Sequence, residues 1–326
     1  MTISTAAGVD VGRDWLDVAI AQSSGARSSG AGRASRHFRI ANTPSAVAAL
    51  PARLRRAGVE CVVLESTGAP AARLVRALAE AAMPTGVVDP RRIRALRLAE
   101  GRKAKTDRLD AGLIARFALI MTDVARPAPT PAAMELRALS TRRRQLVEMI
   151  AAEKTRLKQA FEPILLASLK ETIRLLGEER ARIEAMIETR TGAAPEDRRR
   201  RELLRSVPGF GPVICATLQA DLPELGARDN KVIASLAGVA PHIQQSGVAQ
   251  GHAHIQGGRP CVRAALYMAA LSAVRHDPGF KADYTAMRAK GKPAKVALIA
   301  IARKLVVAAN AVLKHNQPWT THHQRR

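Results

Sequence analysis

The spacing of hydrophobic and polar positions changes twice along the 326-residue chain and predicts three regions. In residues 1–125, short apolar runs bounded by Gly, Pro and Ser alternate with segments of helical period. Alternating strands and helices favour an α/β domain with a mixed sheet and helices on its faces. The predicted strands lie within 7–21 (with a turn inside), 37–41, 61–65 and 86–89, and the predicted helices cover 43–56, 70–82 and 106–120.

Residues 126–201 follow a helical period throughout. Apolar side chains recur there at steps of three, four or seven on both sides of Pro163. This pattern predicts two amphipathic helices, which form either a helical hairpin within one subunit or a coiled coil that pairs subunits. Residues 202–326 combine helical segments with glycine-rich interruptions, so we expect a mainly α-helical domain.

One interruption in the last region has a recognisable pattern. Residues 205–218 (RSVPGFGPVICATL) place Pro-Gly-x-Gly between two apolar helical stretches. The pattern is similar to a helix-hairpin-helix element, whose turn can direct backbone N–H groups at a phosphate. A simple turn between two helices fits the same residues equally well.

The composition is strongly basic, with 52 Lys and Arg against 28 Asp and Glu and a formal net charge of +24. The surplus extends over all three regions and favours a polyanionic partner such as nucleic acid, although a genome biased towards Arg would also produce it. Aromatic residues make up 3% of the chain, which argues against base-stacking platforms. Three scattered cysteines give no disulfide framework and suggest a reducing cytoplasm. The apolar runs are too short to predict a membrane span.

Four acids stand at positions where predicted elements begin or end. Asp10 lies between small residues in the first strand, Glu65 ends a buried strand, and Asp107 and Asp110 share one face of a helix. If they converge at one end of the sheet, their repulsion requires a divalent metal. Two Mg²⁺ ions could then stabilise displacement at a phosphodiester.

Each acid also has a simpler interpretation. Asp10 could belong, with Asp14 and Asp17, to the turn and surface of a hairpin, and Glu65 could cap the helix after it. Asp107 and Asp110 could pair with basic neighbours, namely Arg102, Lys103, Lys105 and Arg108.

Several motifs together carry a family resemblance over nearly the whole chain. They are GVDVGRDWLDVA, LESTG and KTDRLDA in the first region, and LAGVAP, QQSG, IQGGRPCVRAALYMAAL and KGKPAKVALIAIARKL in the last. In this order they resemble the DEDD-type transposases of insertion-sequence family 110. The resemblance implies an RNase H-like, RuvC-like domain over 1–125, in which Asp10, Glu65, Asp107 and Asp110 bind metal. A helical coiled-coil region over 126–201 and a C-terminal serine transposase domain over 202–326 would follow.

The resemblance also implies that Ser246, before Gly247, attacks DNA and forms a covalent phosphoserine intermediate in a composite site made when DNA binds. From the residues alone, a loop serine beside a glycine is the simpler interpretation. Ser235 is the nearest competitor, but its apolar helical context predicts a buried residue.

Six basic residues are further candidates for phosphate contacts, although surface charge explains them nearly as well. They are Arg259, Arg263, Lys292, Lys295, Arg303 and Lys304. A zinc site built from His252, His254 and Cys261 lacks a second ligand pair, so we do not predict one.

The implied function is cutting and rejoining of DNA by an insertion-element transposase that uses Mg²⁺. A noncoding bridge RNA would pair with donor and target DNA, and a homodimer or homotetramer in the nucleoid would hold the strands. Two alternatives stay open. One is a metal-dependent junction-resolving nuclease that activates water and leaves Ser246 structural, and the other is a non-catalytic nucleic-acid-binding scaffold.

Overall fold

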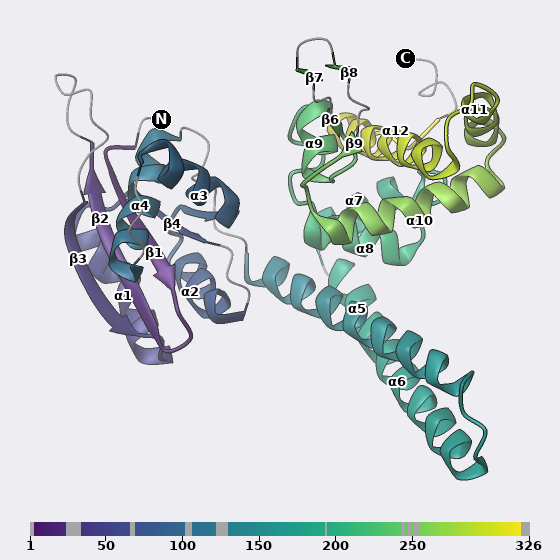
Figure 1. Cartoon of the computed structure of the whole chain (residues 1–326), viewed down its shortest axis with the longest axis horizontal. Helices are drawn as coiled ribbons and strands as arrows, with labels where there is room; N and C mark the ends of the chain where they lie inside the picture. The colour runs from purple at the N-terminus through teal and green to yellow at the C-terminus, as the bar shows by residue number, and fades with distance from the viewer. Residues whose placement is uncertain are drawn as a thin grey trace. The chain divides into compact units, whose positions relative to one another are not determined.

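The computed structural model describes residues 3–23, 34–65, 69–101, 106–121, 130–192, 194–242, 245–246, 249–250 and 254–320. The chain divides into two compact units, residues 1–134 and 135–326. Figure 1 shows the first unit as a sheet with helices and the second as helices with short strands. The two long helices of the predicted middle region fall within the second unit from residue 135 onward.

The N-terminal unit is built on a five-stranded mixed sheet in the order β3-β2-β1-β4-β5. The strands β1, β2 and β3 pair antiparallel, whereas β4 pairs parallel with both β1 and β5. The mixed sheet predicted from the sequence is therefore confirmed. The strands are β1 (Thr5–Val11), β2 (Trp15–Gln22), β3 (Ala34–Ala41), β4 (Cys61–Glu65) and β5 (Thr85–Val88).

Helices α1 (Pro44–Arg56) and α2 (Ala69–Glu80) cover one face of this sheet. Alternate residues of β1 and β2, such as Val9 and Val18, enter a core with Leu50 of α1 and Leu74 of α2. Because side chains of a strand alternate between its two faces, the intervening residues of β1 and β2 point to the opposite side. That side includes Gly8 and Asp10.

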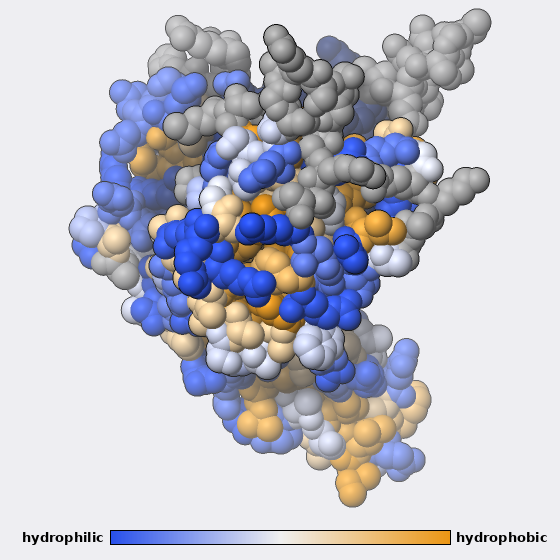
Figure 2. All heavy atoms as spheres, turned by 90° about the vertical axis from the view of Figure 1, so that its left-hand side faces the viewer, coloured by the Kyte–Doolittle hydropathy of each residue, from blue (hydrophilic) through white to orange (hydrophobic). Residues whose placement is uncertain are grey.

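The opposite face carries α3 (Pro90–Ala99) and α4 (Asp107–Ile120). A Cβ atom at Gly8 would lie 2.2 Å from the backbone nitrogen of Ala115 and 2.3 Å from the carbonyl oxygen of Ala111. Glycine therefore lets α4 approach β1 closely, two residues before Asp10. Figure 2, which views the molecule from the left-hand side of Figure 1, shows hydrophilic side chains around an area of hydrophobic ones.

The second unit contains a long antiparallel hairpin, α5 (Pro131–Leu157) and α6 (Pro163–Thr191), which we call the arm. Two helices on either side of Pro163 were predicted, and this is confirmed. Ion pairs between Arg143 and Glu184 (2.7 Å) and between Arg190 and Glu135 (2.9 Å) join the helices. Figure 1 shows the arm projecting from the other helices of its unit.

The remaining helices of the second unit form one core. Helix α12 has the length and hydropathy of a membrane span, but 56% of its most apolar window is buried, and Ile301, Leu305 and Val306 lie in this core. The helices are α7 (Pro195–Arg205), α8 (Pro212–Asp221), α9 (Asn230–Leu236), α10 (Pro260–His276), α11 (Pro278–Ala289) and α12 (Ala294–His315).

The Pro-Gly-x-Gly segment joins α7 to α8, as predicted. Gly209 has φ +81°, and a Cβ there would lie 2.3 Å from the carbonyl oxygen of Ala269 in α10. This turn therefore needs glycine both for its backbone conformation and for its contact with α10.

The segment between α9 and α10 forms two short antiparallel ladders where the sequence predicted only an interruption. Strands β6 (Pro241–His242) and β9 (His254–Ile255) pair with each other, and β7 (Gln245–Ser246) pairs with β8 (Ala249–Gln250). We call residues 241–255 the serine loop.

Candidate metal centre and serine loop

Two of the predicted acids lie side by side on neighbouring strands. Val9 of β1 is paired with Leu64 of β4, and both side chains enter the core with α1 and α2. Asp10 and Glu65 each follow by one residue, so both half-buried side chains belong to the α4 face of the sheet. The register of two parallel strands thus brings together residues that are 55 positions apart in the sequence.

The other two predicted acids lie in the first turn of α4. Asp107 is exposed and Asp110 is 8% exposed. The hydroxyl oxygen of Thr106 accepts a hydrogen bond from the backbone N–H of Leu109 (3.3 Å) and caps the helix. Carboxylates are stabilised at this end because the helix dipole is positive there.

The electrostatics of Asp10 show that the strand acid and the helix acids are close enough to interact. The pKa of Asp10 is raised from 3.8 to about 6, first by burial and then by neighbouring carboxylates. In order of effect these carboxylates belong to Asp110, Asp107 and Asp17. The site therefore concentrates negative charge around Asp10.

Asp17 is a further acid beside the site, which the sequence analysis did not count among the four metal-binding acids. It is 4% exposed and lies directly across from Asp10 in the β1–β2 ladder. Its carboxylate contacts His37 Nε2 (3.0 Å) and Arg39 Nη2 (2.8 Å). The alternative that Asp17 lies on the surface of a hairpin is therefore wrong. Asp14, which the same alternative placed there, is exposed. The period-two alternation with Ala19 and Ala21 was the available signal, since both alanines pack against α4.

Two arginines act as internal counter-ions of the cluster. Arg39 Nη2 lies 3.1 Å from Asp107 Oδ2, so this guanidinium is shared between Asp17 and Asp107. Arg97 of α3 forms an ion pair with the buried Asp110. Among the basic partners considered from the sequence, Arg102, Lys103 and Lys105 lie outside the described residues, so pairing with them stays untested.

The chemistry of the donor set fits a hard divalent cation, because all its ligands would be carboxylate oxygens. The pKa of Asp10 is raised first by burial and then by neighbouring carboxylates, and such a cation would offset both effects. No group of three or more His, Cys, Asp or Glu side chains within the described ranges is already arranged around a metal position. A bound ion would compete with Arg39 for Asp107 and with Arg97 for Asp110.

Ser246 lies in β7, where its backbone pairs with Ala249. Its side chain, Gln244 and Gly247 lie outside what the structure describes. Ser235 in α9 is exposed, so the prediction that it is buried is wrong.

The loop that carries Ser246 begins and ends near two glycines that contact each other, Gly238 and Gly258, and we call this contact and residues 256–258 the neck. Gly238 (φ +72°) and Gly258 (φ +65°) are in backbone contact, because a Cβ at Gly258 would lie 2.3 Å from the Gly238 Cα. No other residue type fits at Gly238 or Gly258 without moving the chain segment that carries the other glycine. The two ends of the loop are therefore fixed to each other.

Two predicted phosphate-binding arginines secure this neck. Arg259 forms a two-pronged ion pair with Glu224 (2.6 and 2.7 Å), and Arg263 donates to the carbonyl oxygen of Gly257 (2.8 Å). Phosphate would have to compete with these acceptors. Lys304 pairs with Asp283 (2.7 Å). Of the remaining candidates, Lys292 and Lys295 are exposed and Arg303 is half-buried.

Carboxylates gathered on one face of a mixed sheet, in a chain of net charge +24, suit chemistry on nucleic-acid backbones. Residues 7–165 match a family model of DEDD, IS110 type described as "Transposase", and residues 201–285 match "Transposase IS116/IS110/IS902 family". Both matches point to one family and together they span most of the chain. The chain belongs to the IS110-type transposases and is a DNA transposase or recombinase.

Individual relatives agree with this assignment. A pilin gene-inverting protein of Moraxella lacunata is 28% identical over 262 residues, covering 79% of this chain and 81% of that protein. The "Insertion element IS900 uncharacterized 42 kDa protein" of Mycobacterium paratuberculosis is 30% identical over 172 residues, covering 50% and 41%. Among solved structures, Thermus thermophilus RuvC is similar at a TM-score of 0.30 and 19% identity, covering 38% of this chain and 99% of that one.

Proposed function

We propose that this transposase cleaves and rejoins DNA with two groups of residues: a carboxylate centre formed by Asp10, Glu65, Asp107 and Asp110, and the hydroxyl of Ser246. The observation that carries the proposal is the convergence of the acids. Asp10 and Glu65 are adjacent through strand register, and the charges of Asp107 and Asp110 act on Asp10. Antiparallel β1–β2–β3 joined to parallel β4 and β5 agrees with the RNase H-like fold that the family resemblance implies.

The four carboxylates would hold Mg²⁺, and a cluster of four such acids suits two ions. When bound, the metal would polarise a phosphodiester and neutralise charge that develops on its oxygens. Asp10 must release its proton before it can bind metal, so its raised pKa should weaken metal binding as pH falls below about 6. Arg39 and Arg97 pair with Asp107 and Asp110, and a bound ion would compete with them.

Ser246 would act as the nucleophile. Its oxygen would form a bond to phosphorus while the bond from phosphorus to one sugar oxygen breaks, and the serine proton would leave with the released sugar hydroxyl. The enzyme would then hold one DNA end covalently, and the reverse reaction with a new sugar hydroxyl would rejoin DNA and free the serine. The glycine neck supports this role because it fixes both ends of the loop that presents Ser246.

The nucleic-acid partners would be donor DNA, target DNA and a bridge RNA from the element. Exposed Lys292 and Lys295, with Arg303 and Lys304, would contact phosphates around the start of α12. Recombination requires several cleaved ends to be held together, so we propose a homodimer or homotetramer that acts in the nucleoid. The name of the Moraxella relative, a pilin gene-inverting protein, is in line with DNA rearrangement.

The test is a covalent trap on the full chain. Labelled DNA containing the joined ends of the element is incubated with Mg²⁺ and RNA transcribed from the flanking noncoding segment. We expect a protein–DNA adduct that resists denaturation and disappears in Ser246→Ala. The control Ser235→Ala alters an exposed serine of α9 and should leave the adduct unchanged.

Other outcomes separate the alternatives. Cleavage that persists in Ser246→Ala and yields free ends without an adduct would refute the serine mechanism and favour activated water. Activity that is unaffected by Asp10→Asn, Glu65→Gln and removal of Mg²⁺ would refute the carboxylate centre and leave a binding scaffold. Adduct formation without the RNA would refute RNA guidance.

A further inference from the structure

The arm meets its own unit over a small apolar contact. Leu146 of α5 and Ile183 and Ile187 of α6 pack there with Ala216 and Ala220 of α8. The next residue along the chain, Asp221, ends α8 and is 5% exposed. A carboxylate is unfavourable at this place, because the helix dipole is negative at a C-terminus and burial removes water from the charge.

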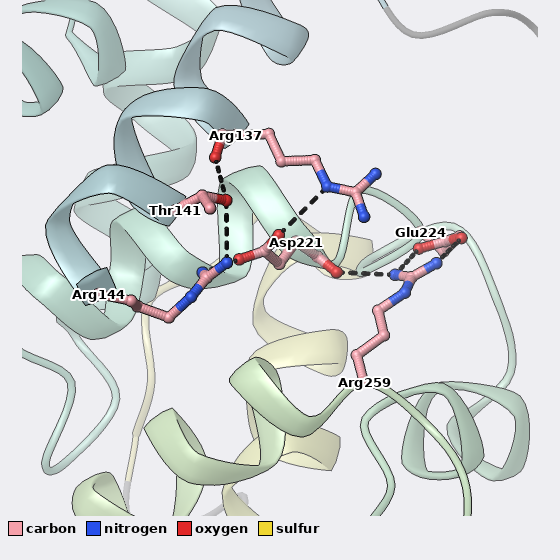
Figure 3. Close-up of polar contacts among 6 residues, drawn as sticks. All are labelled: Arg137, Thr141, Arg144, Asp221, Glu224 and Arg259. Atoms are coloured by element: carbon pink, nitrogen blue, oxygen red, sulfur yellow. Dashed lines mark hydrogen bonds and ion pairs between the residues drawn. The ribbon is translucent and has the colours of Figure 1, made fainter. Parts of the chain in front are cut away.

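Two arginines of the arm compensate for that charge. Arg144 Nη1 lies 2.8 Å from one carboxylate oxygen of Asp221, and Arg137 Nε lies 3.5 Å from the other. Figure 3 shows both side chains reaching Asp221 from α5. Arg144 also donates to the Thr141 hydroxyl oxygen (3.0 Å), which fixes the guanidinium on this face of the helix.

The backbone of the same residue holds the serine loop. Arg259 Nη1 donates to the carbonyl oxygen of Asp221 (2.8 Å) while its two-pronged pair with Glu224 orients the guanidinium (Figure 3). Arg259 directly follows Gly258 of the neck, and its backbone N–H donates to Leu236 of α9 (2.9 Å). The arm thus contacts the Asp221 side chain, which also interacts with the Cys261 thiol, and Arg259 beside the neck contacts the Asp221 main chain.

We propose that Asp221 is a positioning residue that couples the arm to the neck of the serine loop. A displacement of α5 moves Arg144, which moves the end of α8 and therefore the carbonyl oxygen that holds Arg259. The loop then reaches its cleaving position only while the arm is seated on Asp221. The effect on DNA chemistry rests on the proposed role of Ser246, whereas the coupling itself does not.

The first measurement is hydrogen exchange of backbone amides in β6, β9 and residues 256–258 of the full chain, without DNA. Arg144→Gln breaks the arm side of the contact, and Arg144 touches no residue of the neck. We expect neck amides to exchange between about two- and thirtyfold faster, the range of couplings carried through contiguous contacts. Arg144→Lys keeps the charge and should restore part of the protection.

The matched control is Arg174→Gln, which removes an arm arginine that pairs with Glu171 (2.6 Å) and Glu178 on the surface of α6. It should leave neck exchange unchanged. A double-mutant cycle between Arg144→Gln and Arg259→Gln should be non-additive. Unchanged neck exchange in Arg144→Gln with a normal circular-dichroism spectrum, or additive effects in the cycle, would overturn the proposal.

The second measurement is DNA cleavage. Arg144→Gln should lower kcat about two- to thirtyfold and leave KM unchanged, because the substitution displaces the serine loop but does not affect DNA binding. Equal loss through KM alone would contradict coupling to the loop. If Ser246→Ala still cleaves DNA, the proposed function is refuted. The hydrogen-exchange measurement tests the coupling independently of that outcome.

Discussion

Asp10 should destabilise the metal-free protein above pH 6, and removing its charge should make the protein more stable. Folding raises the pKa of Asp10 from 3.8 to about 6, so the folded state binds more protons than the unfolded chain between these values. Stability therefore falls as pH rises through this window and stays lower above it. The change corresponds to roughly 3 kcal/mol for a fully shielded carboxyl. Because Asp10 is only partly buried, solvent screening reduces the expected effect to about 1–2 kcal/mol.

The assay is urea unfolding of the parent and of Asp10→Asn in a chelating buffer, at pH 5 and pH 7.5. At pH 7.5 the variant should be more stable by about 1–2 kcal/mol, and the difference should shrink at pH 5. Asp14→Asn is the matched control, since Asp14 is an exposed acid of the same hairpin and should show no such difference. Titration of the Asp10 carboxyl by NMR gives the pKa directly. A pKa near 3.8, or an Asp10→Asn protein no more stable than the parent at pH 7.5, would refute the reasoning.

Three further predictions follow from the same geometry. Gly8→Ala should lower the free energy of unfolding in urea by about 2 kcal/mol or more, because its Cβ would overlap the backbone of α4. Gly177→Ala, whose Cβ would have no neighbouring atom within 4 Å, should raise it by up to about 1 kcal/mol. Equal effects of the two substitutions would contradict the close approach of α4 to β1. Arg97→Gln should bind Mg²⁺ more tightly in calorimetry, because a cation that competes for the buried Asp110 is lost, and weaker binding would show that Arg97 assists the metal. DNA affinity should fall linearly on logarithmic axes as salt rises, and salt-independent binding would contradict phosphate contacts.

Much of the fold could be predicted from local patterns. The strand Cys61–Glu65 matches its prediction because a buried strand is a continuous apolar run with polar ends. Helix α3 was not predicted, because its apolar residues are interrupted by arginines and Ile93 alone among its residues is buried. The available signal was Asp89 followed by Pro90. The Asp89 side chain accepts a hydrogen bond from the Arg91 backbone N–H and caps the helix, and Pro90 occupies its first turn. The two-residue strands of the serine loop are too short to show any period.

The acids of the candidate site could be selected from the sequence, whereas their surroundings could not. Arg39 and Arg97 reach Asp107 and Asp110 from β3 and α3, and such pairings depend on the tertiary fold. Asp17 has a polar side chain within an apolar strand, and its place on the same strand face as Ala19 and Ala21 is the one local signal of its burial. Its burial results from two partners on β3, the neighbouring strand.

The contact between Gly238 and Gly258 makes the segment between them a replaceable module. Its two ends leave the helical scaffold from one point, so a shorter or longer insert needs no change in the helices on either side. Grafting this segment from another member of the family should therefore preserve the folded scaffold, provided that both glycines are kept.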